Sequence, residues 1–81
     1  MILLILSEKW VKQLQKEGET GMGYLIVSVI LKDGRRYDKV VVIQSACIAG
    51  IKGIIEIPFT EEDINQIIAT HDKWNFKLES K

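Results

Sequence analysis

Residues 24–43, YLIVSVILKDGRRYDKVVVI, decide the fold, because two strand-like apolar runs flank the dipeptide Asp33-Gly34. An Asp-Gly dipeptide tolerates the positive φ angles of a type I′ turn, and β-branched runs on both sides of it are typical of a β-hairpin. We therefore expect a central hairpin with a two-residue loop. The predicted pairs across it are Lys32 with Arg35, Val29 with Asp38, Val27 with Val40, and Leu25 with Val42.

Both faces of this hairpin are apolar near its open end. One face carries Leu25, Val27, Val29, Leu31, Val40 and Val42, and the other carries Tyr24, Ile26, Ile30, Tyr37, Val41 and Ile43. A sheet with one face in water alternates apolar and polar residues instead. We therefore expect both faces to be covered, either by two helices or by a second copy of the chain.

An N-terminal helix is predicted over residues 8–17. Ser7 stands where an N-cap belongs, and Gly18 stands where a glycine C-cap belongs. The apolar residues of this segment fall on one helical face, which consists of Trp10, Val11 and Leu14. This face should rest on the sheet.

A second helix is predicted near the C-terminus. Residues 44–53 form a turn-rich connection with a short strand around Ile48, and residues 54–59 form a further strand. Thr60 and Asp63 then have the spacing of a capping box. Ile64, Ile67 and Ile68 follow at the spacing of a helical stripe.

The stretch ATHDKWNF, residues 69–76, contains the only histidine of the chain. His71 continues the isoleucine stripe, so we expect a structural histidine in the last turn of the second helix. A zinc site needs at least two more ligands of suitable type, which this neighbourhood does not supply. Trp74 is expected to fold back onto the core. If it is exposed instead, it becomes a candidate anchor for a protein partner.

Composition narrows the class of protein. The 81 residues include 11 basic and 11 acidic side chains, so no global charge attracts nucleic acid or an anionic membrane. The opening MILLIL is too short to span a membrane. Cys47 is the only cysteine and cannot form an internal disulfide, which favours a reducing, cytoplasmic location. No motif for a cofactor, a metal or a catalytic nucleophile is present.

Charge placement offers one candidate binding site, the hairpin tip. Its basic residues are Lys32, Arg35, Arg36 and Lys39, with Lys52 expected nearby. Such a cluster can contact phosphates. Glu61, Glu62 and Asp63 gather at the predicted start of the second helix, so the tip could also pair with that acidic segment of another chain.

Residues 27–43, VSVILKDGRRYDKVVVI, resemble the strand, turn and strand of Sm-like and other SH3-like small barrels, which also begin with a helix. The acidic and asparagine residues that Sm-like proteins carry in the following loop are absent, so we assign no family. Gly50 and Gly53 have the spacing of the glycine pair in KH domains, but that loop must join two helices. Here the residues that follow predict a strand.

Taken together, the sequence predicts one α+β domain over residues 1–81. A small antiparallel β-sheet, built around the central hairpin 24–43, is flanked by an N-terminal and a C-terminal α-helix. The expected function is a non-catalytic protein-interaction module that self-associates, because so short a chain cannot cover both sheet faces generously. The alternative is a nucleic-acid-binding domain that uses the basic tip. The candidate binding residues are Lys32, Arg35, Arg36, Lys39 and Trp74.

Overall fold

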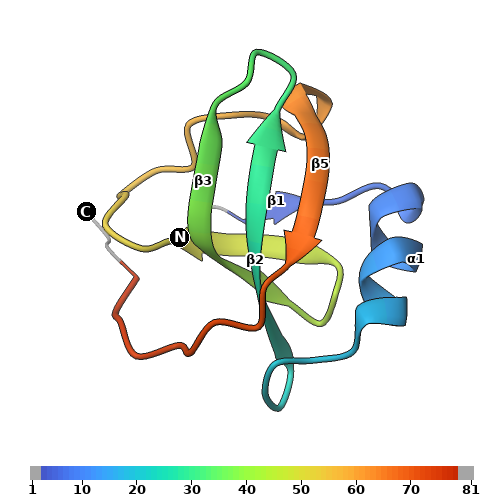
Figure 1. Cartoon of the computed structure of the whole chain (residues 1–81), viewed down its shortest axis with the longest axis vertical. Helices are drawn as coiled ribbons and strands as arrows, with labels where there is room; N and C mark the ends of the chain where they lie inside the picture. Colours follow the sequence, from blue (N-terminus) through green and yellow to red (C-terminus); the bar gives the residue numbers. More distant parts are fainter. Residues whose placement is uncertain (1–2, 79–81) are drawn as a thin grey trace.

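The computed structural model describes residues 3–78 and consists mainly of one curled antiparallel sheet (Figure 1). Its five strands lie in the order β1-β4-β3-β2-β5. The described residues also contain one α-helix and one 3₁₀ turn. The elements are β1 (Leu4–Ile5), α1 (Glu8–Glu17), β2 (Tyr24–Leu31), β3 (Arg36–Ile43), β4 (Cys47–Ile51), η1 (Glu61–Asp63) and β5 (Ile64–Ala69).

The predicted N-terminal helix is confirmed. Helix α1 begins after Ser7 and ends before Gly18, whose φ of 75° is a conformation that favours glycine. Trp10 and Leu14 are buried, as the stripe predicts. Ser7 makes no side-chain cap; instead its backbone N–H donates to Glu61 Oε1 at 3.1 Å. Of the opening MILLIL, residues 1–2 lie outside the described residues and Leu4–Ile5 form β1.

The central hairpin is confirmed, with a different loop. Leu31 N–H donates to the Arg35 carbonyl, and Gly34 has a φ of 95°, so the loop has three residues, Lys32 to Gly34. This is the type I turn with a glycine bulge. The change of loop shifts the register near the tip, where Val29 pairs with Tyr37 instead of Asp38.

A β-bulge restores the predicted register at the open end of the hairpin. The extra residue lies in β3, where Lys39 has a φ of 55°, and beyond it Val27 pairs with Val40 and Leu25 with Val42. The shift near the tip moves Tyr37 to the core face, where its ring lies 5.4 Å from that of Phe59. The prediction that Tyr37 shares a face with Ile26 is therefore wrong.

The predicted C-terminal helix is wrong. Thr60 and Asp63 do form the capping box, but it begins only the 3₁₀ turn η1, and Ile64–Ala69 form β5 beside β2. Every residue of β2 is at least half-buried, so its second edge needs a hydrogen-bonding partner strand. Isoleucine is a weak helix former that suits a strand, and β5 supplies that partner.

The predicted strand over residues 54–59 is also wrong. Only Ile54 makes an isolated β-bridge, to Ile51, and the segment then runs irregularly to Phe59, which is buried in the core. The short strand predicted around Ile48 is confirmed as β4.

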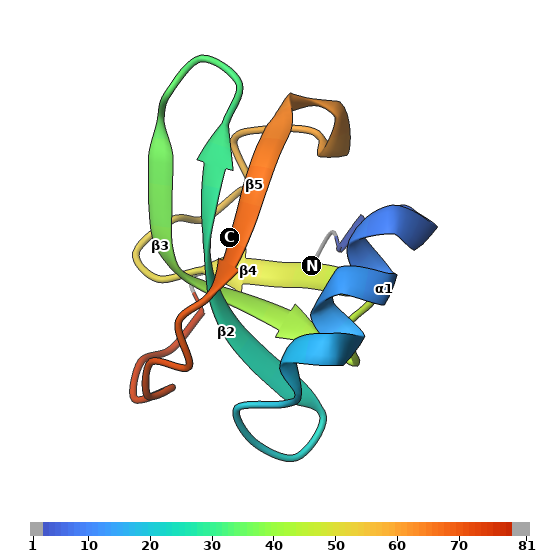
Figure 2. The same cartoon turned by 45° about the vertical axis from the view of Figure 1, so that its right-hand side comes forward.

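The main core lies on the side of the sheet that faces α1. It contains the inward side chains of all five strands together with those of the helix, among them Leu14, Leu25, Val27, Val40, Ile48 and Ile67. Figure 2 shows α1 to one side of the curled sheet, and Gln13 Nε2 of the helix donates to the Ile67 carbonyl of β5 at 2.8 Å. The helix thus satisfies a backbone group at one edge of the sheet.

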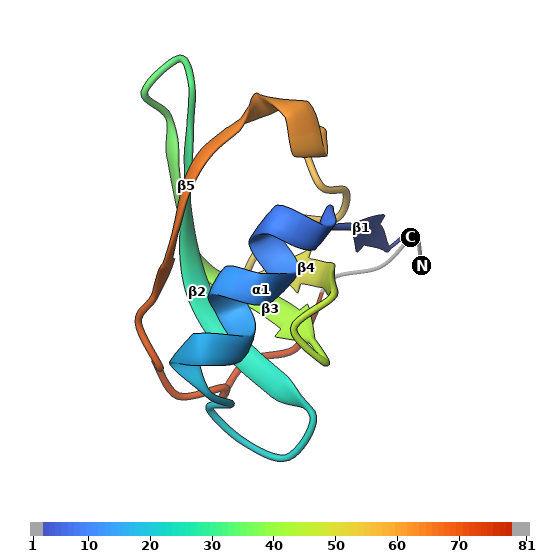
Figure 3. The same ribbon diagram turned by 90° about the vertical axis from the view of Figure 1, so that its right-hand side faces the viewer.

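The opposite face of the sheet is covered by the C-terminal segment of the same chain. We call residues 70–78 the tail; Figure 3 shows the tail leaving β5 on the side of β2 away from α1. Phe76 and Leu78 pack on a second, small cluster formed by Ile26, Val41 and Ala49. Both hairpin faces are covered, as expected, but within this chain the cover of the second face is the irregular tail and not a helix.

Candidate functional site

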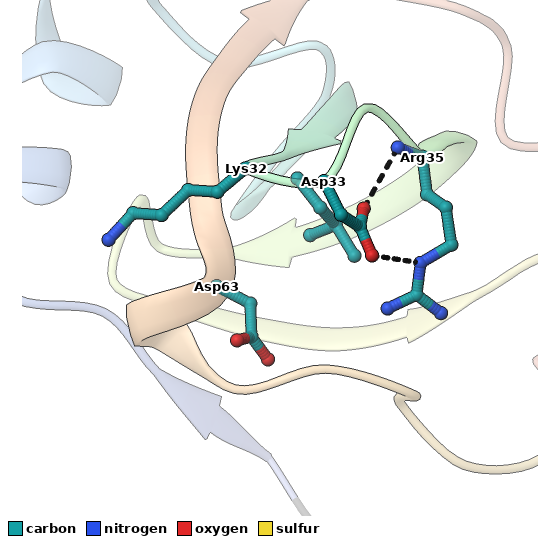
Figure 4. Close-up of a pocket in the computed structure, with 5 residues that line it drawn as sticks. Lys32, Asp33, Arg35 and Asp63 are labelled. Atoms are coloured by element: carbon teal, nitrogen blue, oxygen red, sulfur yellow. Dashed lines mark hydrogen bonds and ion pairs between the residues drawn. The ribbon is translucent and has the colours of Figure 1, made fainter.

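The arginines of the predicted basic tip are paired with carboxylates of the same hairpin. Arg35 Nε donates to Asp33 Oδ2 at 2.8 Å, as Figure 4 shows, and Arg36 Nε donates to Asp38 Oδ1 at 2.9 Å. The backbone N–H of Arg35 also donates to Asp33, and this bond lowers the pKa of that carboxyl. The bond to Asp33 in turn raises the pKa of Arg35. These pairs reduce the positive field that a phosphate would meet.

A buried hydroxyl holds the second of these carboxylates. Ser28 is fully buried in β2, and its hydroxyl donates to Asp38 Oδ1 at 2.6 Å. This bond, followed by that from Arg36, lowers the pKa of Asp38. The bulge in β3 makes the contact possible, because it turns Asp38 away from the core face.

The two lysines of the predicted cluster point elsewhere. Lys39 Nζ lies 3.2 Å from Asp72 Oδ2, so Lys39 ties β3 to the tail. Lys32 makes no ion pair with any described residue, and Figure 4 shows its side chain directed away from Arg35. The hollow beneath the tip has a volume of only about 130 Å³ and is lined by Leu31, Lys32, Asp33, Arg35 and Asp63. The structure does not bring the four cations together as one site.

Trp74 is exposed, contrary to the expectation that it covers the core. The residue is 38% accessible, and its ring meets that of Tyr24 edge-on, with 4.9 Å between the ring centroids. The centroid of the Phe76 ring lies 6.4 Å from that of Trp74. Lys52, which we expected near the tip, holds its Nζ 5.9 Å from the Phe76 ring. We call these four residues, Tyr24, Lys52, Trp74 and Phe76, the tail surface.

The sequence offered two signals for this surface. Two lysines flank two aromatic residues in KWNFK, residues 73–77, and Tyr24 stands at the open end of the hairpin on the face opposite the core. Neither signal shows that the segment returns across the sheet, because that path depends on β5 being a strand. The predicted helix would have ended elsewhere.

His71 is not at a helix end. It follows β5, has a φ of 54°, and its Nδ1 lies 2.9 Å from Thr20 Oγ1. That hydroxyl oxygen also accepts the Ile26 N–H at 3.0 Å. His71 therefore links the tail to the loop before β2.

No chemically reactive cluster is found in residues 3–78. They contain no group of three or more His, Cys, Asp or Glu that could hold a metal ion. Cys47 is half-buried, and its Sγ lies 3.9 Å from the Ile43 carbonyl. The tail surface and the hairpin tip remain as the two candidate binding sites.

Comparison with known proteins gives no match: no family model, no curated protein and no solved structure is similar to this chain. None of the helices in the described part of the chain has the length and apolar character needed to cross a membrane. The function must therefore be inferred from the surface itself.

Proposed function

We propose that this chain is a non-catalytic protein-interaction module that binds another protein through its tail surface. The observation that carries the proposal is the exposed Trp74 ring, which the Tyr24 ring contacts edge-on. Tryptophan and tyrosine dominate the binding energy of many protein interfaces. A ring already held in place loses little conformational entropy on binding.

The charges around Trp74 indicate the chemistry of the partner. Lys52, Lys73 and Lys77 are exposed, whereas the nearest carboxylate of the tail, Asp72, is already paired with Lys39. An apolar pocket with an acidic rim would complement such a surface. We place this interaction in the cytoplasm, because a lone half-buried thiol suits a reducing compartment.

The nucleic-acid alternative has less support. Its predicted site, the tip, presents two arginines that are paired with neighbouring carboxylates, and Lys39 lies with the tail. Phosphate binding there would have to displace these partners. We therefore rank nucleic acid second.

The test compares matched surface variants as bait. Wild type, Trp74→Ala and Met22→Ala are immobilised and exposed to extract of the native cell; Met22 is the control because its side chain is 99% exposed. We expect a protein that binds wild type and the Met22 variant, is lost with Trp74→Ala, and weakens when Lys52 and Lys77 become glutamate. Equal capture by the Trp74 variant would contradict the proposal. Nuclease-sensitive material that is lost when Arg35 and Arg36 become glutamate would place nucleic acid first.

A further inference from the structure

We propose that two copies of this chain exchange their tails, each tail covering the Ile26, Val41 and Ala49 cluster of the other copy, with His71 as the hinge. This dimer goes beyond the partner binding proposed above and does not depend on it. It identifies the second copy as the occupant of the sheet face opposite α1.

The sheet surface under the tail is shaped to fit the side chains of the tail. Phe76 and Leu78 pack on the apolar cluster, and Leu78 passes so close to Gly50 that a Cβ there would lie 2.9 Å from Leu78 Cδ2. A segment that covers this cluster must therefore place a side chain like that of Leu78 directly over Gly50, where there is no Cβ. A second copy of the chain carries the identical segment, so it fits by construction.

The contacts of the tail beyond the hinge are with the body of the molecule. They include the Lys39–Asp72 ion pair, the β-bridge between Lys52 and Leu78, and the ring contact of Trp74 with Tyr24. Each forms equally well within one chain or between two. The balance between monomer and exchanged dimer is consequently set by concentration and by the hinge.

The hinge residue is strained in the closed chain. His71 has a φ of 54°, where a side chain with a Cβ is disfavoured, because the chain must turn back at the end of β5. The N–H groups of Thr70 and His71 both donate to the Ile26 carbonyl, at 3.2 and 3.1 Å, which marks the point of the turn. In an exchanged dimer the chain can continue outward with residue 71 extended, and this strain is released.

Several contacts of the turned-back hinge oppose the exchange; besides the bonds to the Ile26 carbonyl, Thr70 Oγ1 donates to Asp72 Oδ2 at 3.0 Å across residue 71. The bond of 2.9 Å between His71 Nδ1 and Thr20 Oγ1 belongs to the turned-back hinge, but it is exposed to solvent and competes with water. Because the two effects act against each other at one residue, changes at His71 that alter only the backbone preference should shift the equilibrium.

The experiment compares His71→Gly with His71→Val by sedimentation equilibrium over a wide concentration range. Both variants lose the bond to Thr20, so they differ in how well they tolerate a positive φ. Glycine favours the closed monomer and valine favours the extended hinge. Each hinge should change the dissociation constant of the dimer by roughly tenfold, and a dimer has two hinges. The valine dimer should therefore be about a hundredfold tighter than the glycine dimer.

Gln44 provides the matched control. It is exposed in the turn between β3 and β4 and has a φ of 51°, so Gln44→Gly and Gln44→Val impose the same backbone change away from the tail. We expect equal masses for this pair. Circular dichroism checks that each variant folds, and if a valine variant does not, alanine replaces valine at that position, since His71→Ala also lacks the bond to Thr20 and carries a Cβ.

Every outcome decides the inference. A dimer that tightens from glycine to valine at position 71 and not at position 44 supports tail exchange. A dimer of equal strength in both position-71 variants overturns the exchange and leaves another mode of self-association. A monomer at every concentration overturns self-association altogether, without touching the binding of Trp74 to a different protein.

Discussion

Gly50 lies directly against Leu78, so that a Cβ on Gly50 would approach Leu78 Cδ2 to 2.9 Å. Gly50→Ala should be tolerated, because the end of the leucine side chain can rotate away. Gly50→Val adds bulk that this movement cannot accommodate, and the tail should leave its seat. We expect a red shift of tryptophan fluorescence in the valine variant, since Trp74 loses Tyr24, while buried Trp10 stays unchanged. Identical spectra for both variants would show that Leu78 does not hold the tail.

The ion pair between Lys39 and Asp72 should contribute little to stability. Its side chains are 36% and 37% exposed, and pairs that solvent reaches are worth at most about 1 kcal/mol. We expect Asp72→Asn to lower the free energy of unfolding by about 0.5 kcal/mol in low salt and by less in high salt. The pair on α1 between Lys12, at 70% exposure, and Glu8, at 81%, is the control: Lys12→Gln should be neutral in urea titrations. A loss well above this range would mean that the pair is a main attachment of the tail.

Leu14 anchors the helix in the main core. It is fully buried, and Leu14→Ala should lower the free energy of unfolding by about 2–5 kcal/mol, the cost of lost burial and of the cavity left behind. Lys16→Ala on the exposed face of the same helix should change it by less than about 0.5 kcal/mol. Urea titrations at one temperature measure both. A cost below about 1 kcal/mol for Leu14→Ala would mean that α1 is not packed as described.

The sequence predicted the hairpin and the first helix, because both depend on local patterns. The Asp33-Gly34 dipeptide and the end positions Ser7 and Gly18 act within a few residues, and they mark a turn and two helix ends that the structure has, although Ser7 makes no side-chain hydrogen bond. The loop length and the bulge at Lys39 could not be read in this way. The longer loop and the bulge compensate each other. The same apolar residues therefore face the core at the open end of the hairpin as with the predicted two-residue loop.

The isoleucines of β5 show why the C-terminal half was misread. A register irregularity opposite Ile30 and Leu31 brings Ile64 and Ile67 to one face of a strand, which reproduces the spacing of a helix. A capping box before them strengthens the wrong interpretation. Whether this segment is a helix or a strand is decided by the edge of β2 that β3 leaves unpaired. That edge exists only in the tertiary structure, so local sequence patterns do not show it. The position of Trp74 follows from β5, so the sequence identified only Trp74 of the tail surface as a candidate and did not predict where it lies.

Stability should fall in acid because of the carboxylates at the tip. The pKa of Asp38 is held below its ordinary value of 3.8, first by the Ser28 hydroxyl and then by Arg36. Since the folded pKa is lower than the unfolded one, this stabilisation is fully present above the unfolded value and is lost as the pH falls through the folded value. Asp38→Asn keeps an acceptor for Ser28 but does not titrate. We expect its stability to change less than that of wild type below about pH 4 in urea titrations. If the free energy of unfolding falls with pH equally in wild type and in Asp38→Asn, the bonds to the Asp38 carboxylate do not stabilise the folded state.

The internal pairing of the tip predicts how it will behave toward nucleic acid. In wild type, Asp33 and Asp38 occupy the two arginines, so binding of single- or double-stranded oligonucleotides near physiological salt should be weak or absent. The double variant Asp33→Asn, Asp38→Asn removes both anions and frees Arg35 and Arg36. Each phosphate that a freed side chain contacts should add a slope of about −0.7 to −0.9 to the dependence of log affinity on log salt.

Glu8→Gln with Glu17→Gln makes the same change in net charge on α1, away from the tip, and controls for the global effect. We expect fluorescence anisotropy to show salt-dependent binding for the tip variant, little for the helix variant, and none after Arg35 and Arg36 become glutamate. Tight binding by wild type would instead mean that phosphates displace the aspartates, and would reverse our ranking of the two functions.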